Sequence, residues 1–286
     1  MTDAPSDLFA ALGQPNRLAI FRLLARRAPD GVPAGEIAEA VGIKPNVASV
    51  HLAILARAGL IAGARAGKQI LYRIDLVRAG SLIDYLALDC CRGRPELCAP
   101  LTAAILSNPA RQEPSMAESR IFNVLFICSG NSARSIMAEA ILEREGGGKF
   151  RAFSAGTRPT SELNPLAVEK LASLGHDTSK LRSKNVAEFQ TLDAPRMDFV
   201  FTVCDLAANE ECPPWAGQPI SGHWGMPDPV KVEGTMAERQ LAFSETYRQL
   251  KHRISAFANL PVASLDRISL QREVDRIGRM DARTDA

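Results

Sequence analysis

The chain has 286 residues, which is long enough for two domains that each bury a core of their own. Its 46% of apolar and 23% of charged residues are those of an ordinary soluble globular protein, and the net charge of +2 is too small to identify a partner. The sequence contains no run of about 18 apolar residues and no signal peptide, so we expect no membrane span and a cytoplasmic protein.

The first hundred residues predict helices followed by a hairpin. Apolar spacing predicts one or two helices between Asp7 and Arg27, with a break at residues 13–15. Two further helices are expected at residues 35–41 and 45–58, across a turn that contains Gly42, and two strands within residues 60–74. Such a helix pair occurs in many helical cores, but a basic hairpin directly after it indicates a DNA-binding winged helix-turn-helix.

The basic residues of this region are not balanced by acids, since residues 41–74 contain five Lys or Arg and no Asp or Glu. The second helix of the pair would enter the major groove, and the hairpin would contact phosphates or the minor groove. The groove-facing candidates are Lys44, Asn46, Ser49 and His51, and the hairpin candidates are Arg65 and Lys68. His51 could equally be a packed helix residue.

Residues 46–60 and 67–73 resemble the ArsR-type winged-helix repressors. The resemblance implies a homodimer, built on the first helix and on a helix at residues 76–88, that reads an inverted repeat in operator DNA. Many such repressors hold a metal in the first helix of the reading pair, but residues 35–40 contain no Cys here.

Three thiols lie instead just beyond the dimerisation helix, at Cys90, Cys91 and Cys98. Three thiolates suit trivalent arsenic or antimony, whereas a structural zinc site would need a fourth ligand. Some arsenic-responsive repressors carry a similar trio, which implies arsenite or antimonite as the inducer. The alternative is that these thiols are incidental or partly buried.

The second half of the chain alternates strands with helices. Strands are predicted at residues 122–127, 150–154 and 199–203, and helices at residues 135–144, 165–174 and 237–257. This alternation is typical of an α/β doubly wound parallel sheet, in which the site gathers at the carboxyl ends of the strands. We therefore predict a winged helix-turn-helix domain at 1–100, a linker at 101–119, the α/β domain at 120–265, and a C-terminal helix and tail at 266–286.

The strongest chemical signal is the loop from Cys128 to Ser135, which joins a strand to a helix. Backbone N–H groups at a helix N-terminus cradle a tetrahedral oxyanion. Arg134 can grip two oxygens of that anion, while the helix end and Ser135 favour the thiolate of Cys128. The predicted oxyanion-binding residues are Ser129, Gly130, Asn131, Ser132, Ala133, Arg134 and Ser135. The alternative is a buried structural Cys at a strand end.

This loop resembles that of the low-molecular-weight protein tyrosine phosphatases and of the arsenate reductases that share their fold, and the resemblance runs from about residue 122 to 260. It implies that Asp228, which precedes a proline, is the general acid; the alternative is an Asp that only caps a turn. A phosphatase needs one thiol, whereas a reductase must supply two electrons and needs further thiols for exchange. Cys204 and Cys212 can supply them.

The resemblance to thioredoxin-coupled arsenate reductases implies a disulfide relay. Cys128 attacks bound arsenate while Asp228 helps hydroxide to leave, Cys204 attacks Cys128 and releases arsenite, and Cys212 presents the disulfide to thioredoxin or a small-thiol system. No tightly bound cofactor is expected. Asn131, Glu139 and Ser154 match positions that support the loop, in some relatives through a potassium ion.

The sequence therefore predicts a fusion of an arsenic-responsive repressor with an arsenate reductase. One alternative is a tyrosine phosphatase tethered to a DNA-binding domain, with Cys204 and Cys212 as core thiols. The segment after Asp228 lacks the tyrosines that line a phosphotyrosine slot, which favours the reductase. A second alternative is a regulator whose α/β domain only binds an oxyanion.

Overall fold

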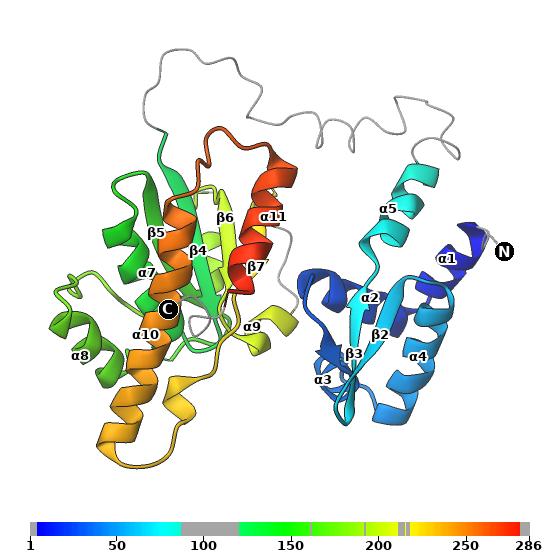
Figure 1. Ribbon diagram of the computed structural model, residues 1–286, viewed down its shortest axis with the longest axis horizontal. Helices are drawn as coiled ribbons and strands as arrows, with labels where there is room; N and C mark the ends of the chain where they lie inside the picture. Colours follow the sequence, from blue (N-terminus) through cyan, green and yellow to red (C-terminus); the bar gives the residue numbers. More distant parts are fainter. Residues whose placement is uncertain are drawn as a thin grey trace. The chain divides into compact units, whose positions relative to one another are not determined.

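The computed structural model describes residues 5–86, 120–160, 162–191, 193–210, 215 and 218–280. The chain divides into two compact units, residues 1–115 and 116–286 (Figure 1). The predicted linker at 101–119 spans the division but lies outside the described residues. None of the described helices is long and apolar enough to span a bilayer.

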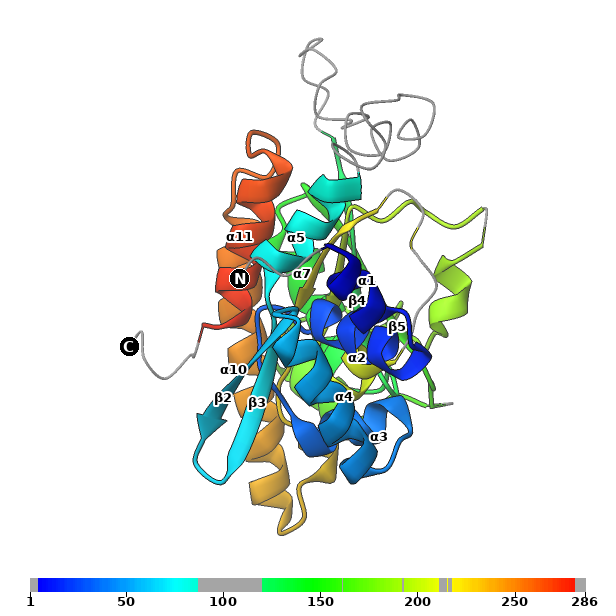
Figure 2. The same ribbon diagram turned by 90° about the vertical axis from the view of Figure 1, so that its right-hand side faces the viewer.

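The first unit is a winged helix-turn-helix, as predicted (Figure 2). Its helices are α1 (Pro5–Leu12), α2 (Pro15–Arg26), α3 (Ala34–Val41), α4 (Pro45–Arg57) and α5 (Leu76–Asp84), and its strands are β1 (Val32–Pro33), β2 (Ile61–Ala66) and β3 (Gln69–Ile74). The strands pair antiparallel in the order β1-β3-β2. The sequence did not predict β1, because two residues show no periodicity.

The turn between α3 and α4 depends on Gly42. This glycine ends α3 in the left-handed conformation, with φ of 71°, and its N–H donates to carbonyls of the last turn of α3. The next helix begins at Pro45, where proline needs no hydrogen-bond partner for its nitrogen. Ala48, Leu52 and Leu55 then recur at helical spacing and are buried in the core of the unit, which leaves the opposite face of α4 exposed.

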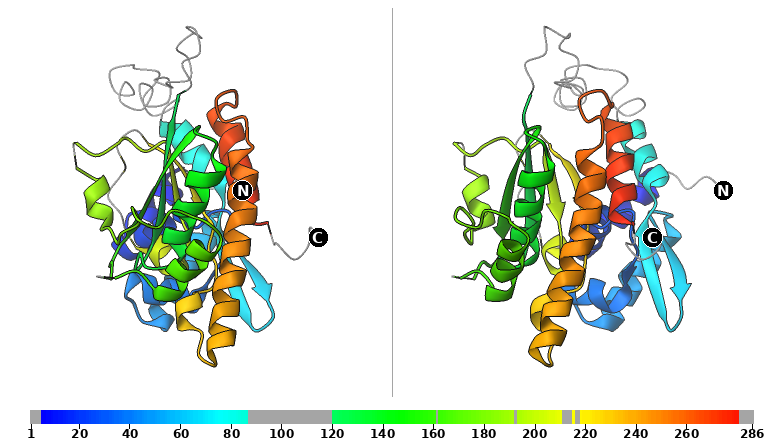
Figure 3. Two further views of the ribbon diagram at one scale, coloured as in Figure 1. Left: turned by 90° about the vertical axis from the view of Figure 1, so that its left-hand side faces the viewer. Right: turned by 60° about the vertical axis from the view of Figure 1, so that its left-hand side comes forward.

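The second unit is a four-stranded parallel sheet with helices, as predicted. Its elements are β4 (Phe122–Cys128), α7 (Arg134–Glu145), β5 (Phe150–Gly156), α8 (Pro165–Ser173), η3 (Val186–Phe189), β6 (Phe199–Thr202), α9 (Asp205–Asn209), β7 (Ile220–His223), η4 (Pro229–Lys231), α10 (Met236–Ala258) and α11 (Arg267–Gly278). The strand order is β5-β4-β6-β7, and every neighbouring pair is parallel. Figure 3 shows α10 running beside the sheet, where it packs against α7, α8 and α11.

The C-terminal helix α11 completes the core of the α/β unit. Leu270, Val274 and Ile277 are buried in the same hydrophobic cluster as the sheet, and α11 packs on β7. A methyl group added at Gly222 of β7 would lie 2.6 Å from Cγ1 of Val274, so only glycine permits this close approach. The α/β unit therefore extends through α11, beyond residue 265, where the domain was predicted to end.

An aromatic cluster lies beneath the carboxyl ends of the central strands. The rings of Phe201 and Trp224 stack with centroids 4.0 Å apart, and Phe257 of α10 contacts both edge-on. Phe126 of β4 packs against the same two residues. This packing fixes β4 relative to β6, and so fixes the segments that follow them.

Candidate active site

The fold brings the two predicted redox thiols of the described region to one edge of the sheet. Cys128 ends β4, Cys204 follows β6, and these strands pair in parallel with Ile127 opposite Thr202. Both thiols are buried and neither forms a disulfide. The hydroxyl of Ser129, the residue after Cys128, lies 3.4 Å from Sγ of Cys204. Cys128 and Cys204 therefore lie at the same edge of the sheet, as the fold predicted.

The loop from Cys128 to Ser135, called here the Cys128 loop, wraps around its own sulfur. Oγ of Ser135 lies 2.9 Å from Sγ of Cys128, and the N–H of Asn131 donates to the same sulfur at 3.2 Å. Asn131 is fully buried with φ of 45°, a left-handed conformation that Asn tolerates better than most residues. Ala133 provides no capping side chain to α7, so the first N–H groups of this helix can face an oxyanion.

Burial has the largest effect on the pKa of the Cys128 thiol. Desolvation raises the pKa of the Cys128 thiol, and the nearby Cys204 raises it further, while hydrogen bonds from Ser135 and Asn131 lower it. Together these effects raise the pKa of Cys128 above its ordinary value. The expectation that the loop favours the thiolate considered only the donors around the sulfur, because burial cannot be read from a local motif.

Arg134 and Asp228 meet although they are far apart in the sequence. Nη2 of Arg134 lies 2.8 Å from Oδ2 of Asp228, and Nη1 donates to the carbonyl of Met226 at 3.2 Å. Asp228 also accepts from the N–H of Val230, so it caps η4 as well as reaching the guanidinium. The carboxyl group therefore lies beside the residue that would hold the oxyanion, as a general acid requires.

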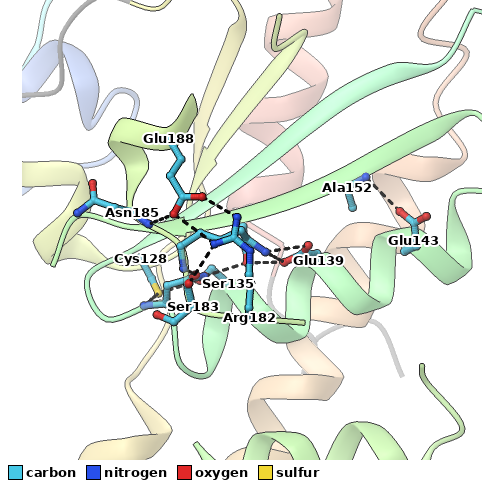
Figure 4. Close-up of polar contacts among 12 residues, drawn as sticks. Cys128, Ser135, Glu139, Glu143, Ala152, Arg182, Ser183, Asn185 and Glu188 are labelled. Atoms are coloured by element: carbon cyan, nitrogen blue, oxygen red, sulfur yellow. Dashed lines mark hydrogen bonds and ion pairs between the residues drawn. The ribbon is translucent and has the colours of Figure 1, made fainter. Parts of the chain in front are cut away.

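The residues behind the loop form a buried polar network (Figure 4). The amide nitrogen of Asn131 donates to the hydroxyls of Ser135 and Ser154, each at 2.9 Å, and Ser154 donates to Glu139 at 2.5 Å. Nζ of Lys184 lies 2.8 Å from the same carboxylate. Burial raises the pKa of Glu139, while the charge and hydrogen bond of Lys184 lower it. Sequence reasoning missed Lys184, because it lies in a segment without periodicity.

A second contact that the sequence did not predict secures the segment around Cys204. Nε2 of His223 lies 2.8 Å from Oδ1 of Asp205, and Nδ1 lies 2.9 Å from the hydroxyl of Thr202. Cys204 itself caps the short helix α9, where its sulfur accepts from the N–H of Ala207 at 3.4 Å. His223 thus ties β7 to the residue that follows the second thiol. Cys212 lies outside the described residues.

The predicted DNA-contacting residues of the first unit are exposed, except for His51. Lys44, Asn46 and Ser49 at the start of α4 are exposed, as are Arg65 and Lys68 of the hairpin. His51 is half-buried, and its Nδ1 is buried without a hydrogen-bond partner in the described structure. This placement favours the packed alternative for His51.

Cys90, Cys91 and Cys98, the expected arsenite ligands, lie outside the described residues. Within the described ranges, no group of three or more His, Cys, Asp or Glu side chains is arranged to hold a metal ion.

Comparison with known proteins places both units. The family described as low molecular weight phosphotyrosine protein phosphatase matches residues 123–274, and a helix-turn-helix domain family matches residues 12–64. An arsenate reductase of Shouchella clausii is 35% identical over 135 residues, which cover 47% of this chain and 94% of the relative. An arsenate reductase of Archaeoglobus fulgidus, with a solved structure, is 26% identical over 46% of this chain and 98% of its own, with a TM-score of 0.37.

A solved structure of a predicted DNA-binding transcriptional regulator from E. coli is 30% identical to this chain, covering 28% of it and 82% of the regulator, with a TM-score of 0.25. The phosphatase family, in contrast, matches more than half of the chain, and the match contains the Cys128 loop, Cys204 and Asp228. The chain belongs to the low molecular weight phosphotyrosine protein phosphatase family and carries a helix-turn-helix domain before it.

Proposed function

We propose that the α/β unit is an arsenate reductase that uses protein thiols as its source of electrons. The observation that carries the proposal is the second buried thiol at the nucleophile: Cys204 lies within 3.4 Å of Ser129 on the Cys128 loop. Phosphate ester hydrolysis has no step for a second thiol, whereas reduction by two electrons requires one. The similarity to the Shouchella clausii arsenate reductase supports the same function.

The reaction begins when Arg134 and the N–H groups of the Cys128 loop bind arsenate. Sγ of Cys128 bonds to arsenic as its thiol proton passes to an arsenate oxygen, and one arsenate hydroxyl leaves as water after Asp228 donates a proton. Cys204 then attacks Sγ of Cys128. The new S–S bond forms as the S–As bond breaks, and the electron pair of that bond stays on arsenic. Two thiols are thus oxidised to one disulfide, As(V) is reduced to As(III), and arsenite departs with the proton that Cys204 loses.

The enzyme must then regain its thiols. Cys212 attacks Cys204, which frees Cys128 as a thiol and leaves a Cys204–Cys212 disulfide. An external thiol system, thioredoxin or a small thiol, reduces this disulfide by exchange. The free and buried state of Cys128 and Cys204 in the structure is the state that begins the cycle.

The test compares two reactions in the same variants. Cys204→Ser should lower steady-state arsenate reduction by about 10³-fold or more, because the S–As bond then has no attacking thiol. Hydrolysis of an aryl phosphate needs only Cys128, Arg134 and Asp228, so it should change by less than about threefold. Cys128→Ser should abolish both. If Cys204→Ser leaves arsenate reduction unchanged, the relay is wrong, and if wild type only hydrolyses the ester, the chain is a phosphatase.

We infer that the first unit is an arsenic-responsive repressor that binds operator DNA as a homodimer. The exposed cations at the start of α4 and on the hairpin provide a basic surface that fits the DNA backbone and grooves. Cys90, Cys91 and Cys98 would bind arsenite or antimonite and thereby change the dimer that reads the DNA. In this arrangement the product of one unit is the inducer of the other.

Fluorescence anisotropy with DNA from immediately upstream of the coding sequence tests this inference. Wild type should bind that DNA and release it when arsenite is added, and a variant with Ser at all three N-terminal thiols should bind but not respond. Replacing Arg65 and Lys68 by Ala should weaken binding and reduce its salt dependence, because fewer counterions are released. If DNA binding is unchanged both by arsenite and by the loss of Arg65 and Lys68, the inference of a repressor is refuted.

A further inference from the structure

Four residues next to the Cys128 loop form a closed ring of hydrogen bonds and one ion pair. Asn131 donates to Ser154 at 2.9 Å, Ser154 donates to Glu139 at 2.5 Å, and Nζ of Lys184 contacts both carboxylate oxygens of Glu139, at 2.8 and 3.1 Å. The ring closes because the backbone N–H of Lys184 donates to Oδ1 of Asn131 at 2.6 Å. Figure 4 shows Glu139, on α7, among these contacts, with Cys128 and Ser135 nearby.

The ring joins segments that are distant in the sequence. Asn131 belongs to the loop after β4, Ser154 to β5, Glu139 to α7, and Lys184 to the segment before η3. Lys184 is held on its backbone as well, because its carbonyl accepts from the N–H of Gly156 at 2.8 Å. The backbone of Lys184 is therefore held in place by hydrogen bonds through both its N–H and its carbonyl, which positions its amine beside Glu139.

The ammonium of Lys184 is a buried charge with a defined partner. The side chains of Lys184 and Glu139 are only 7% and 14% exposed. A buried carboxylate without a cation would be strongly disfavoured, because nothing in the interior replaces its lost hydration. The negative charge of Glu139 therefore needs a cation at this point, and the chain supplies it.

A potassium ion does not fit this arrangement. Asn131, Glu139 and Ser154 match positions that, as the resemblance implied, support the loop through potassium in some relatives. Here both oxygens of the Glu139 carboxylate already contact Nζ of Lys184. A potassium ion on the same carboxylate would lie against a second positive charge in a buried region, where repulsion is poorly screened.

We propose that Lys184 is a built-in monovalent cation that positions the Cys128 loop, so that oxyanion binding by this protein is independent of potassium. Lys184 touches neither the sulfur nor the oxyanion-binding N–H groups. It acts through Asn131, whose amide nitrogen donates to Ser135 and whose backbone N–H donates to the sulfur of Cys128. With Glu139 unpaired, Asn131 would lose part of its support and the loop its anion-binding geometry.

Inorganic phosphate is the probe for the test, and its affinity for the full chain is measured by calorimetry in choline chloride or in potassium chloride of equal ionic strength. The phosphate Kd of wild type should be the same in both salts. Lys184→Ala should bind about tenfold more weakly in choline chloride and regain its affinity in potassium or ammonium chloride, because a small cation can replace the lost amine.

Two further variants separate this role from a structural one. Lys180→Ala, which removes an exposed lysine of the same segment, should behave like wild type in both salts. The double variant Glu139→Gln with Lys184→Ala should bind weakly in both salts, because no carboxylate remains to attract a cation. Potassium dependence in wild type, or a Lys184→Ala defect that no cation restores, would overturn the proposal.

The inference rests on the proposed function only in that the loop binds an oxyanion, so the thermal midpoint Tm is measured in the same salts. Potassium should raise the Tm of Lys184→Ala and leave that of wild type unchanged. If no variant binds phosphate, the proposed function fails while Tm still decides the role of Lys184. If Lys184→Ala folds in potassium chloride but not in choline chloride, the proposal is supported; failure in both salts overturns it.

Discussion

Cys128 combines a buried position with hydrogen-bond donors on its sulfur. Its thiol is desolvated at the end of a central strand, which raises its pKa, yet Ser135 and Asn131 both place donors on the sulfur. The same donors can stabilise the thiolate when it forms, and Arg134 is held nearby by Asp228. The loop therefore combines a buried Cys128 thiol of raised pKa with hydrogen-bond donors that can stabilise its charged form.

The raised pKa of Cys128 predicts a dependence of stability on pH. A thiol whose pKa is higher in the folded than in the unfolded state binds its proton more tightly when folded, so its contribution is present at neutral pH. That contribution is lost as the pH rises above about 8.5, the ordinary pKa of Cys, towards the folded pKa. Urea denaturation at pH 7 and pH 10 should therefore show a larger loss of unfolding free energy for wild type than for Cys128→Ser. Equal losses would contradict this assignment.

At the scale of elements, the periodicity of apolar residues predicted most helices and strands of the α/β unit. Apolar spacing predicted β4, α7, β5, α8, β6 and α10 to within one or two residues, and the spacing of Cys128 and Arg134 identified the loop between two of them. The strand β7 was missed because it is short and contains Gly222, a residue that weakens strand signals. Its place in the sheet is fixed by packing against β6 and α11, which no local pattern records.

The close contact between β7 and α11 predicts a coupled pair of mutations. Gly222→Ala should destabilise the α/β unit by about 1–3 kcal/mol, because the new methyl group would overlap Cγ1 of Val274. Val274→Ala alone should also destabilise it, by about 1–3 kcal/mol, because it leaves a cavity. The double variant should be more stable than the sum of the single effects predicts, because the space left by Val274→Ala accommodates the methyl group added at residue 222.

Urea denaturation of the full chain, followed by the fluorescence of the buried Trp224, measures these free energies. Ile277→Ala in the same helix, combined with Gly222→Ala, is the control, because Ile277 is not among the residues nearest to the methyl group that this substitution adds. Effects that add equally in both pairs would mean that α11 does not pack on β7 as described.

At the scale of the whole molecule, the chain joins two units with separate hydrophobic cores. The sequence predicted both folds and the position of Cys128 and Cys204 at one edge of the sheet. It could not predict Lys184 or His223 as parts of the site, because their roles depend on contacts with Glu139 and Asp205 that only the folded chain creates. The desolvation of Cys128 was missed for the same reason.

The proposed chemistry requires that the α/β unit itself supplies the two electrons for arsenate reduction. A single-turnover reaction of fully reduced protein with arsenate and no external thiol tests this, with arsenite quantified and the disulfide located by mass spectrometry. We expect about one arsenite per chain from wild type, with two thiols lost among Cys128, Cys204 and Cys212, and none from Cys204→Ser. Wild type that forms no arsenite, or forms it without losing these thiols, would show that the electrons do not come from this relay.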